Sequence, residues 1–141
     1  MSVTGIGYWV ALYNDSKALC EKNAAGESVA RQYVFQHGDA NKLDFPNGSF
    51  DAVISNYVYH NITGADKHEL LLETLRVLKK GGVFAFNDNM KPKMYGYMEA
   101  FAQKLRDMEF QDVRLIDTAQ EVFGSPRRAT QMMLGKIQRN E

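Results

Sequence analysis

The 141-residue chain has only one cysteine and lacks any long apolar run. A lone Cys20 cannot form an internal disulfide, which favours a reducing compartment. No apolar stretch approaches the ~18 residues that a membrane span needs. No charged and then apolar leader precedes Val3. We therefore expect a cytoplasmic protein with no membrane partner.

The sequence also lacks an excess of charge of either sign, because 17 basic side chains are balanced by 17 acidic ones. Nucleic-acid binding draws most of its affinity from clustered lysine and arginine side chains. The paired bases Arg127-Arg128 and Lys79-Lys80 are too short to form such a cluster. We expect no nucleic-acid partner.

Motifs for several common chemistries are missing. Cys20 has no histidine near it in the sequence, and His37, His60 and His68 lack the spacing of metal ligands. We therefore predict no metal site. The chain has neither a Walker phosphate loop nor a nucleophile elbow.

What is present is the composition of an ordinary globular protein, 45% hydrophobic and 24% charged, in a chain long enough for a single domain over residues 1–141. Short apolar runs rich in β-branched residues predict strands at 2–6, 33–37, 51–56, 83–86, 113–116 and 131–137. Helical patterns separate most of these runs. Such alternation implies right-handed crossovers and a mainly parallel sheet.

Three helices are predicted between these strands. The first begins at the cap residues 14–16 and ends near Gly26, with Leu12, Leu19 and Ala24 as its apolar positions.

The second helix begins at a capping box formed by Asp66 and Glu69 and ends at residues 79–81. In the third, Met94, Met98, Phe101, Leu105 and Met108 form one apolar stripe that predicts core packing.

Residues 37 to 86 contain a succession of short motifs: His37-Gly38-Asp39-Ala40, Leu43-Asp44-Phe45-Pro46, Gly48 to Asn56, and Leu75 to Phe84. This succession resembles the middle of a class I S-adenosylmethionine-dependent methyltransferase of the small-molecule type. The resemblance covers nearly the whole chain from Val3. It implies an α/β, Rossmann-like methyltransferase fold with an antiparallel C-terminal strand, which the short link at 124–126 permits.

Members of that family begin with a further strand and a glycine-rich loop that cradles the methionine half of the cofactor. The resemblance therefore implies that this chain lacks the first strand and the N-terminal helices. The absent strand would lie between those at Val3 to Ile6 and Asp51 to Asn56. Unpaired buried backbone groups are costly, so we expect these two strands to pair directly or a second chain to cover their edges. We favour self-association as the way in which these strand edges are covered.

Open α/β sheets bind ligands beyond the carboxyl ends of their strands. After the first strand, Gly7 stands where the family has an acid that accepts from the cofactor ribose. We assign Gly7, Tyr8 and Trp9 to the ribose side of the cofactor site. The alternative, that Gly5-Ile6-Gly7 is the glycine-rich loop itself, leaves room for too few strands before Asp39.

After the second strand, the resemblance implies that Asp39 accepts from the adenine amino group and that the small Ala40 lets the ring lie close. The alternative is that Asp39 only bonds the amides of its own turn. After the third strand, Asn56 belongs to the polar floor that lies beneath the methyl-donating sulfur in relatives. Asp39, Ala40 and Asn56 therefore complete the predicted cofactor site.

His60 is a candidate general base because imidazole titrates near neutrality. The alternative is a structural histidine, since the sequence places no Asp or Glu beside it and many methyl transfers need only positioning. Residues 87–89 form a polar cluster at the end of the fourth strand, or an Asx turn before Lys91-Pro92. Both interpretations stay open.

The resemblance implies methyl transfer from S-adenosylmethionine to an unknown small molecule, either by a homo-oligomer or with a complementing partner chain. Two alternatives remain. The chain is a non-catalytic interaction or nucleotide-sensing module, with Gly7 marking a relaxed cofactor site, or it is a decayed methyltransferase remnant.

Overall fold

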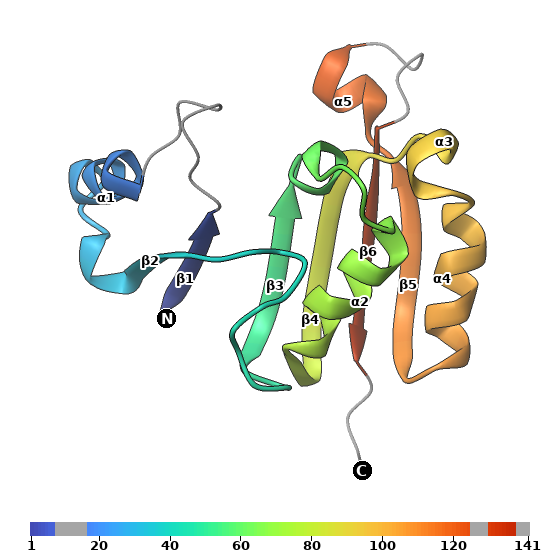
Figure 1. The fold of residues 1–141 in the computed structure, drawn as a ribbon, viewed down its shortest axis with the longest axis horizontal. Coiled ribbons are helices and arrows are strands. Elements are labelled where there is room, and N and C mark those ends of the chain that lie inside the picture. Colours follow the sequence, from blue (N-terminus) through green and yellow to red (C-terminus); the bar gives the residue numbers. More distant parts are fainter. Residues whose placement is uncertain (8–16, 125–129, 138–141) are drawn as a thin grey trace. The chain divides into compact units, whose positions relative to one another are not determined.

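The computed structural model describes residues 1–7, 17–124 and 130–137 (Figure 1). The predicted domain contains two compact units, Met1–Asp44 and Phe45–Glu141, called unit 1 and unit 2 below. Each unit has a sheet of its own. The strand order is β1-β2 in unit 1 and β3-β4-β6-β5 in unit 2.

Unit 1 is a small βαβ arrangement. Its elements are β1 (Val3–Gly7), α1 (Lys17–Gly26), a 3-10 turn η2 (Ala30–Gln32) and β2 (Tyr33–His37). The two strands are parallel and pair from Val3↔Tyr33 to Gly7↔His37, as expected for strands joined through a helix. Both predicted strands are thereby confirmed.

The first helix packs less tightly than its sequence predicts. Ala24 is buried, but the side chain of Leu19 is 47% exposed, because this short helix buries only a narrow face. The predicted apolar residue Leu12 and the predicted cap residues 14–16 lie outside the described residues.

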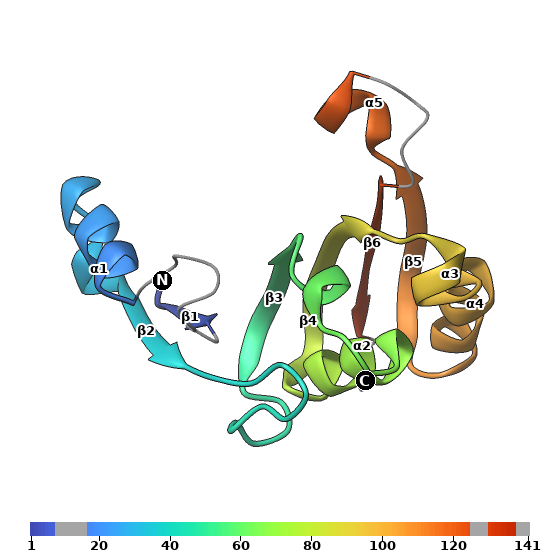
Figure 2. The same cartoon turned by 45° about the horizontal axis from the view of Figure 1, so that its top comes forward.

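Unit 2 holds most of the secondary structure. Its elements are β3 (Phe50–Asn56), η3 (Tyr59–Asn61), α2 (Lys67–Arg76), β4 (Leu78–Asn89), α3 (Pro92–Tyr95), α4 (Met98–Asp107), β5 (Phe110–Asp117), α5 (Ala119–Phe123) and β6 (Thr130–Ile137). Strands β3 and β4 are parallel, and β6 is antiparallel to both β4 and β5, between which it lies (Figure 2). Three strands therefore run one way and the C-terminal strand runs the other way, which confirms the predicted strand directions, although the strands form two sheets rather than one.

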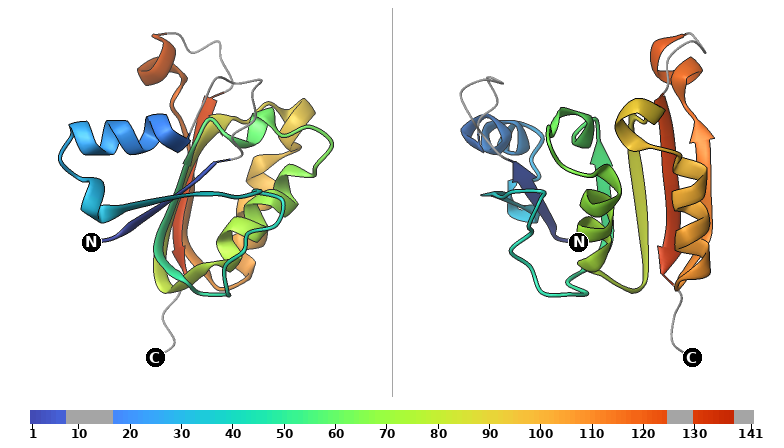
Figure 3. Two further views of the ribbon diagram at one scale, coloured as in Figure 1. Left: turned by 60° about the vertical axis from the view of Figure 1, so that its left-hand side comes forward. Right: turned by 45° about the vertical axis from the view of Figure 1, so that its right-hand side comes forward.

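The core of unit 2 lies between its sheet and the helices α2 and α4, which cover the same face (Figure 3). Leu71 of α2, Phe86 of β4 and Leu105 of α4 are fully buried there. The opposite face is much more open, since Ile54 of β3 is 84% exposed and Val83 of β4 is 51% exposed. Side chains alternate along a strand, so these exposures follow from one covered face.

The second predicted helix has the expected start but an earlier end. The Asp66 side chain accepts from the backbone N–H groups of His68 (2.8 Å) and Glu69 (3.2 Å), which confirms the cap. Helix α2 ends at Arg76, not at residues 79–81. Gly81 does adopt a positive φ of 79°, but inside β4, where the register with β3 shifts. The prediction of the end was wrong because a β-bulge uses the same glycine that a helix end would use.

The predicted methionine-rich helix is broken into two. Gly96, with a φ of 65°, ends α3, and α4 begins at Met98. Met98 is buried, whereas Met94 is 40% exposed and Met108 is 51% exposed. The prediction of core packing is therefore confirmed for the middle of the segment and wrong at both ends. No helix among the described residues is long and apolar enough to span a membrane.

Candidate functional site

The carboxyl ends of β3, β4 and β5 meet at one edge of the sheet of unit 2, because these strands run in the same direction. A chain of side-chain hydrogen bonds links them. Asn87 Nδ2 donates to Asn56 Oδ1 (2.9 Å), and Thr118 Oγ1 donates to Asn87 Oδ1 (2.9 Å). This edge is where open α/β sheets bind ligands, and it includes the predicted site residue Asn56.

His60 lies at this edge, in η3, and has an acidic neighbour. Its Nδ1 is 2.6 Å from Oδ1 of Asp88, and its backbone N–H donates to Asp88 Oδ2 (3.1 Å). The sequence places no acid beside His60, but the fold does, because the parallel pairing of β3 and β4 brings together two residues that are 28 positions apart.

Asp88 is a buried carboxylate, and both of its oxygens take part in hydrogen bonds. Its side chain is 1% exposed. Besides His60, it accepts from Tyr95 Oη (2.7 Å) and from the backbone N–H of Asn89 (2.7 Å). Buried charges need such donors. The alternation of Phe84, Phe86 and Asp88 on the buried face of β4 is the sequence signal that places this carboxylate inward.

The proton on Tyr95 indicates the direction of the His60 hydrogen bond. Burial, with the hydrogen bond to Asp88 as a further cause, raises the pKa of Tyr95 far above its usual value, so Tyr95 stays protonated and donates. With Asp88 accepting from all its neighbours, Nδ1 of His60 carries the hydrogen, and Nε2 is the acceptor when the imidazole is neutral. The His60 side chain is 25% exposed, and no described residue donates to Nε2. His60 therefore has one oriented nitrogen available.

Aromatic rings surround the imidazole. The ring of Tyr57 meets that of His60 edge to face at 5.8 Å, and the ring of Phe123 in α5 meets Tyr57 edge to face at 6.2 Å. Tyr57 has a φ of 55°, which is unusual for a residue with a Cβ. Such backbone strain persists where the surrounding structure holds it. Here the Tyr57 N–H donates to the Asn87 carbonyl (2.8 Å).

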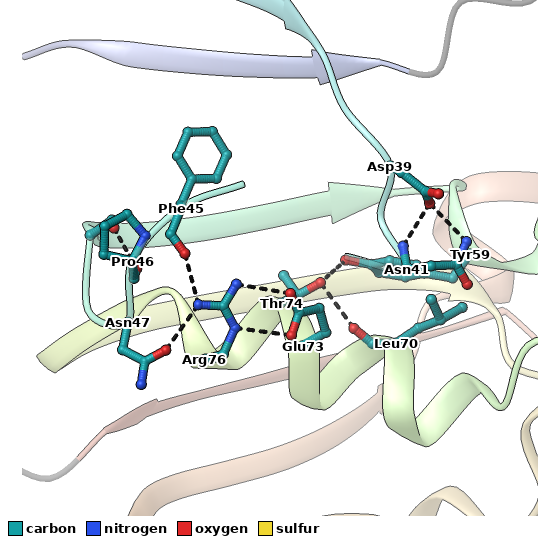
Figure 4. Close-up of polar contacts among 11 residues, drawn as sticks. Asp39, Asn41, Phe45, Pro46, Asn47, Tyr59, Leu70, Glu73, Thr74 and Arg76 are labelled. Atoms are coloured by element: carbon teal, nitrogen blue, oxygen red, sulfur yellow. Dashed lines mark hydrogen bonds and ion pairs between the residues drawn. The ribbon is translucent and has the colours of Figure 1, made fainter. Parts of the chain in front are cut away.

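The segment that carries His60 is tied to α2 (Figure 4). Tyr59 Oη lies 2.6 Å from Thr74 Oγ1, which in turn donates to the Leu70 carbonyl (3.1 Å). Burial raises the pKa of Tyr59 above its usual value. Lys67 also donates to the carbonyl of Ile62 just after η3. Two buried or half-buried anchors therefore fix the position of η3.

Arg76 performs a similar task for the segment before β3. Its guanidinium donates to the Phe45 carbonyl (2.7 Å), to Asn47 Oδ1 (2.9 Å) and to both carboxylate oxygens of Glu73 (Figure 4). The hydrogen bonds to Glu73 raise the pKa of Arg76. The fork geometry of arginine suits this multiple contact.

In unit 1, Asp39 follows β2 and is exposed. Its Oδ1 accepts from the backbone N–H and the side-chain amide of Asn41, both at 2.8 Å (Figure 4). These hydrogen bonds, with the backbone one first, lower the pKa of Asp39 below its usual value. No described residue donates to Oδ2. The local turn and a free acceptor oxygen therefore coexist at Asp39, next to the small Ala40.

The end of β1 offers fewer hydrogen-bonding groups to a ligand than the turn at Asp39. The Gly7 carbonyl accepts from the Gly38 N–H (3.1 Å), and Gly7 has no side chain to accept anything further. A Cβ on Gly38 would lie 2.3 Å from Cγ2 of Ile6, which explains the glycine there. The predicted site residues Tyr8 and Trp9 lie outside the described residues.

Comparison with known proteins gives the class of this fold. A geranyl diphosphate methyltransferase solved with its diphosphate substrate and sinefungin has a TM-score of 0.69 at 11% identity, over 96% of this chain and 62% of that protein. The predicted Rossmann-like methyltransferase fold is confirmed. The family model described as "Methyltransferase domain" matches residues 2–86. This match covers more than half of the chain, and the protein belongs to that methyltransferase family.

Two curated relatives agree with this assignment. An uncharacterized methyltransferase of Bacillus cytotoxicus is 25% identical over 107 residues, which are 70% of this chain and 50% of the relative. A demethylmenaquinone methyltransferase of Listeria welshimeri is 38% identical over 65 residues, which are 46% of this chain and 27% of the relative. The chain thus spans at most about half the length of these relatives.

Proposed function

We propose that this protein transfers a methyl group from S-adenosylmethionine to a small molecule. Membership of the methyltransferase family over residues 2–86 supports this function most directly. S-adenosylmethionine would supply a methyl group already activated on a sulfonium sulfur. The free Oδ2 of Asp39 fits the adenine amino group, because an ionised carboxylate accepts strong hydrogen bonds.

The other residues of the proposed cofactor site differ in what they offer the ligand. Ala40 leaves space beside the adenine, and Tyr8, Trp9 and Asn56 complete the proposed cofactor site. Gly7 offers no carboxylate to the ribose hydroxyls, so the ribose would lose the hydrogen bonds that an acid at this position would provide. We therefore propose weak cofactor binding.

The test is calorimetric titration of S-adenosylhomocysteine, the product form, into the full chain. Asp39→Ala is expected to weaken binding about tenfold, the effect of one hydrogen bond to a charged group. Asp51→Ala is the matched control, because Asp51 is 91% exposed and pairs only loosely with Lys79 at 3.5 Å. Equal affinity for wild type and Asp39→Ala would contradict the adenine assignment. Binding with no methyl transfer to any acceptor would instead favour a nucleotide-sensing module.

We also propose that the active form is a homo-oligomer or a complex with a complementing chain. Strand β3 is the end strand of its sheet, and its Ile54 is 84% exposed. Unprotected edge strands and exposed apolar side chains favour association. Light scattering of the purified protein gives the mass, and a strictly monomeric protein with full activity would refute this part.

The proposed location is the cytoplasm. Its support is the free Cys20, since an unpaired thiol is typical of a reducing compartment.

A further inference from the structure

We infer that His60 Nε2 is the proton acceptor of the reaction and that the methyl acceptor is a hydroxyl group on an aromatic ring. This inference rests on the proposed methyl transfer and specifies its substrate class. It depends on the His60–Asp88 pair and on the rings of Tyr57 and Phe123 beside it.

The first support is the orientation of His60. Asp88 is held by Tyr95 (2.7 Å) and by the N–H of Asn89 (2.7 Å), so it cannot easily turn away from Nδ1 at 2.6 Å. A carboxylate on Nδ1 fixes the tautomer in which Nε2 accepts, and it stabilises the imidazolium that forms. Asp88 is therefore a positioning residue, and His60 is the residue that meets the substrate.

The second support is that Nε2 of His60 makes no hydrogen bond to any described residue. A buried structural histidine normally satisfies both ring nitrogens. Here one nitrogen is bonded to a buried carboxylate, while the side chain remains 25% exposed with no described donor to the other nitrogen. His60 thus presents a lone pair at the edge of the sheet where ligands bind.

The third support is the chemistry of the surrounding rings. Phe123 is 42% exposed and contacts Tyr57, which contacts the imidazole, so a flat molecule beside His60 meets aromatic faces or edges. Aromatic pairs attract each other beyond the effect of the area that they bury. These neighbours favour an aromatic substrate over an aliphatic one.

The acidity of the methyl acceptor favours a phenolic hydroxyl over an aliphatic hydroxyl or a carboxylic acid. A phenol has a pKa near that of tyrosine, about 10, which a neutral imidazole in hydrogen-bond contact can deprotonate during transfer. An aliphatic alcohol is far less acidic than a phenol, with a pKa close to that of water. A carboxylic acid is already ionised and needs no base. Among the described residues, the titratable groups that face His60 are Asp88 of β4 and Tyr57 at the end of β3, and Tyr95 of α3 acts through Asp88.

The proton and electron balance is simple. The phenol O–H bond breaks as an N–H bond forms at Nε2 of His60. The phenol oxygen keeps the electron pair and uses it to bond the methyl carbon while the carbon–sulfur bond of the sulfonium donor breaks. The electron pair of the broken bond stays on sulfur, which becomes a neutral thioether. The imidazolium is stabilised by Asp88 and then releases the Nε2 proton to water.

The test uses 4-nitrocatechol, whose phenolate absorbs visible light, and requires no methyl donor. The full-length protein is titrated with this probe one pH unit below the free probe's own pKa. The wild type is expected to raise the phenolate fraction of the bound probe about tenfold over that of the free probe, because the imidazolium pairs with the phenolate. His60→Gln is expected to abolish this rise. Phe123→Leu is expected to weaken probe binding about fivefold.

The matched control is His68→Gln. His68 is the other histidine of unit 2, and its ring stacks on Phe101 at 4.5 Å, unlike the ring of His60, which pairs with Asp88. His68→Gln should keep the phenolate signal. A signal that survives in His60→Gln, or that is missing in the wild type, overturns the inference. Because the probe is read without a methyl donor, these results are independent of whether S-adenosylhomocysteine binds.

Nitrogen-15 NMR of the wild-type imidazole gives a second readout that needs no variant of His60. The expected state is the tautomer with hydrogen on Nδ1, and Asp88→Asn should shift it toward hydrogen on Nε2. A merely structural Asp88 would not change the tautomer when only its charge is removed. Hydrogen found on Nε2 in the wild type at neutral pH would overturn the role of His60 as acceptor.

Discussion

Unit 1 and unit 2 are both α/β, but they differ sharply in what they bury. Among the described residues, Ala24 is the one buried apolar side chain of unit 1, whereas α2, β4, α4 and β6 all contribute large buried side chains to unit 2. A two-stranded sheet is marginal in water without a substantial apolar face. Unit 2 therefore carries most of the folding free energy.

The two carboxylates to which we assign roles in the proposed site differ in the same way. Among the described residues, exposed Asp39 of unit 1 accepts from Asn41 alone, whereas Asp88 of unit 2 is 1% exposed and accepts from His60, Tyr95 and Asn89. An exposed carboxylate can be lost with little effect on folding, but it is free to bind a ligand. A buried one orients its neighbours and is costly to lose. Variants of the two units should therefore separate binding from stability.

The largest effect is expected for Asp88→Ala. Removal of this carboxylate leaves the donors of His60, Tyr95 and Asn89 buried without an acceptor, and breaking a buried charged cluster costs about 4 kcal/mol. Urea unfolding measures the loss. Asp39→Ala is the counterpart in unit 1 and should unfold at nearly the wild-type urea concentration. An equal loss in both variants would end the distinction between the units.

Core truncation should give the next largest effect. Leu71→Ala in α2 removes a fully buried side chain and should lower the free energy of unfolding by about 3 kcal/mol. Val34→Ala in β2 removes a side chain that is 60% exposed and should cost well under about 1 kcal/mol. Thermal unfolding of the two variants measures the difference, and a Val34→Ala protein that melts as early as Leu71→Ala would contradict it.

Alkaline pH should destabilise unit 2 through its buried tyrosines. Burial raises the pKa values of Tyr95 and Tyr59 in the folded state, so both keep their protons above pH 10, where an unfolded tyrosine loses its own. Their contribution is therefore complete below about pH 10 and falls as the pH rises, by about 1.4 kcal/mol per pH unit for each tyrosine.

Tyr95→Phe tests this pH dependence. It should cost about 2 kcal/mol at neutral pH, because Asp88 loses one donor, and it should reduce the alkaline slope. Unfolding experiments between pH 8 and about pH 11 measure both effects. An unchanged slope in Tyr95→Phe would show that other groups cause the alkaline loss.

The smallest effect on stability is expected for Ile54→Lys, because Ile54 of β3 is 84% exposed. Its effect should instead be on mass, since a lysine on an end strand opposes association. Light scattering should show a smaller particle for Ile54→Lys than for wild type. Val34→Lys in unit 1 is the control, and it should leave the mass unchanged. Identical masses for wild type and Ile54→Lys would contradict association through β3.

Local pattern was enough to predict the strands and the N-cap at Asp66. β-branched runs mark strands wherever they are buried, and the Asp66 cap is a contact between close sequence neighbours. The motif around Asp39 was enough to predict its position directly after β2.

Contacts between residues far apart in the sequence could not be predicted from local pattern. The His60–Asp88 pair depends on the register of β3 and β4, in which Asn56 aligns with Asn87. The break at Gly96 was missed because a glycine within a helical pattern is often tolerated. The end of α2 was missed because the pattern of leucines continues through Leu78, which is buried from a strand rather than from a helix.

Hydrogen–deuterium exchange with and without S-adenosylhomocysteine tests most directly the claim that unit 1 holds the cofactor and unit 2 supplies the stable core. In the free protein, the amides of β1 and β2 should exchange much faster than those of β4 and β6. Addition of the ligand should slow exchange around Asp39 and should leave the start of β4 unchanged. Exchange in unit 1 that is as slow as in unit 2, or that does not respond to saturating ligand, would contradict the account.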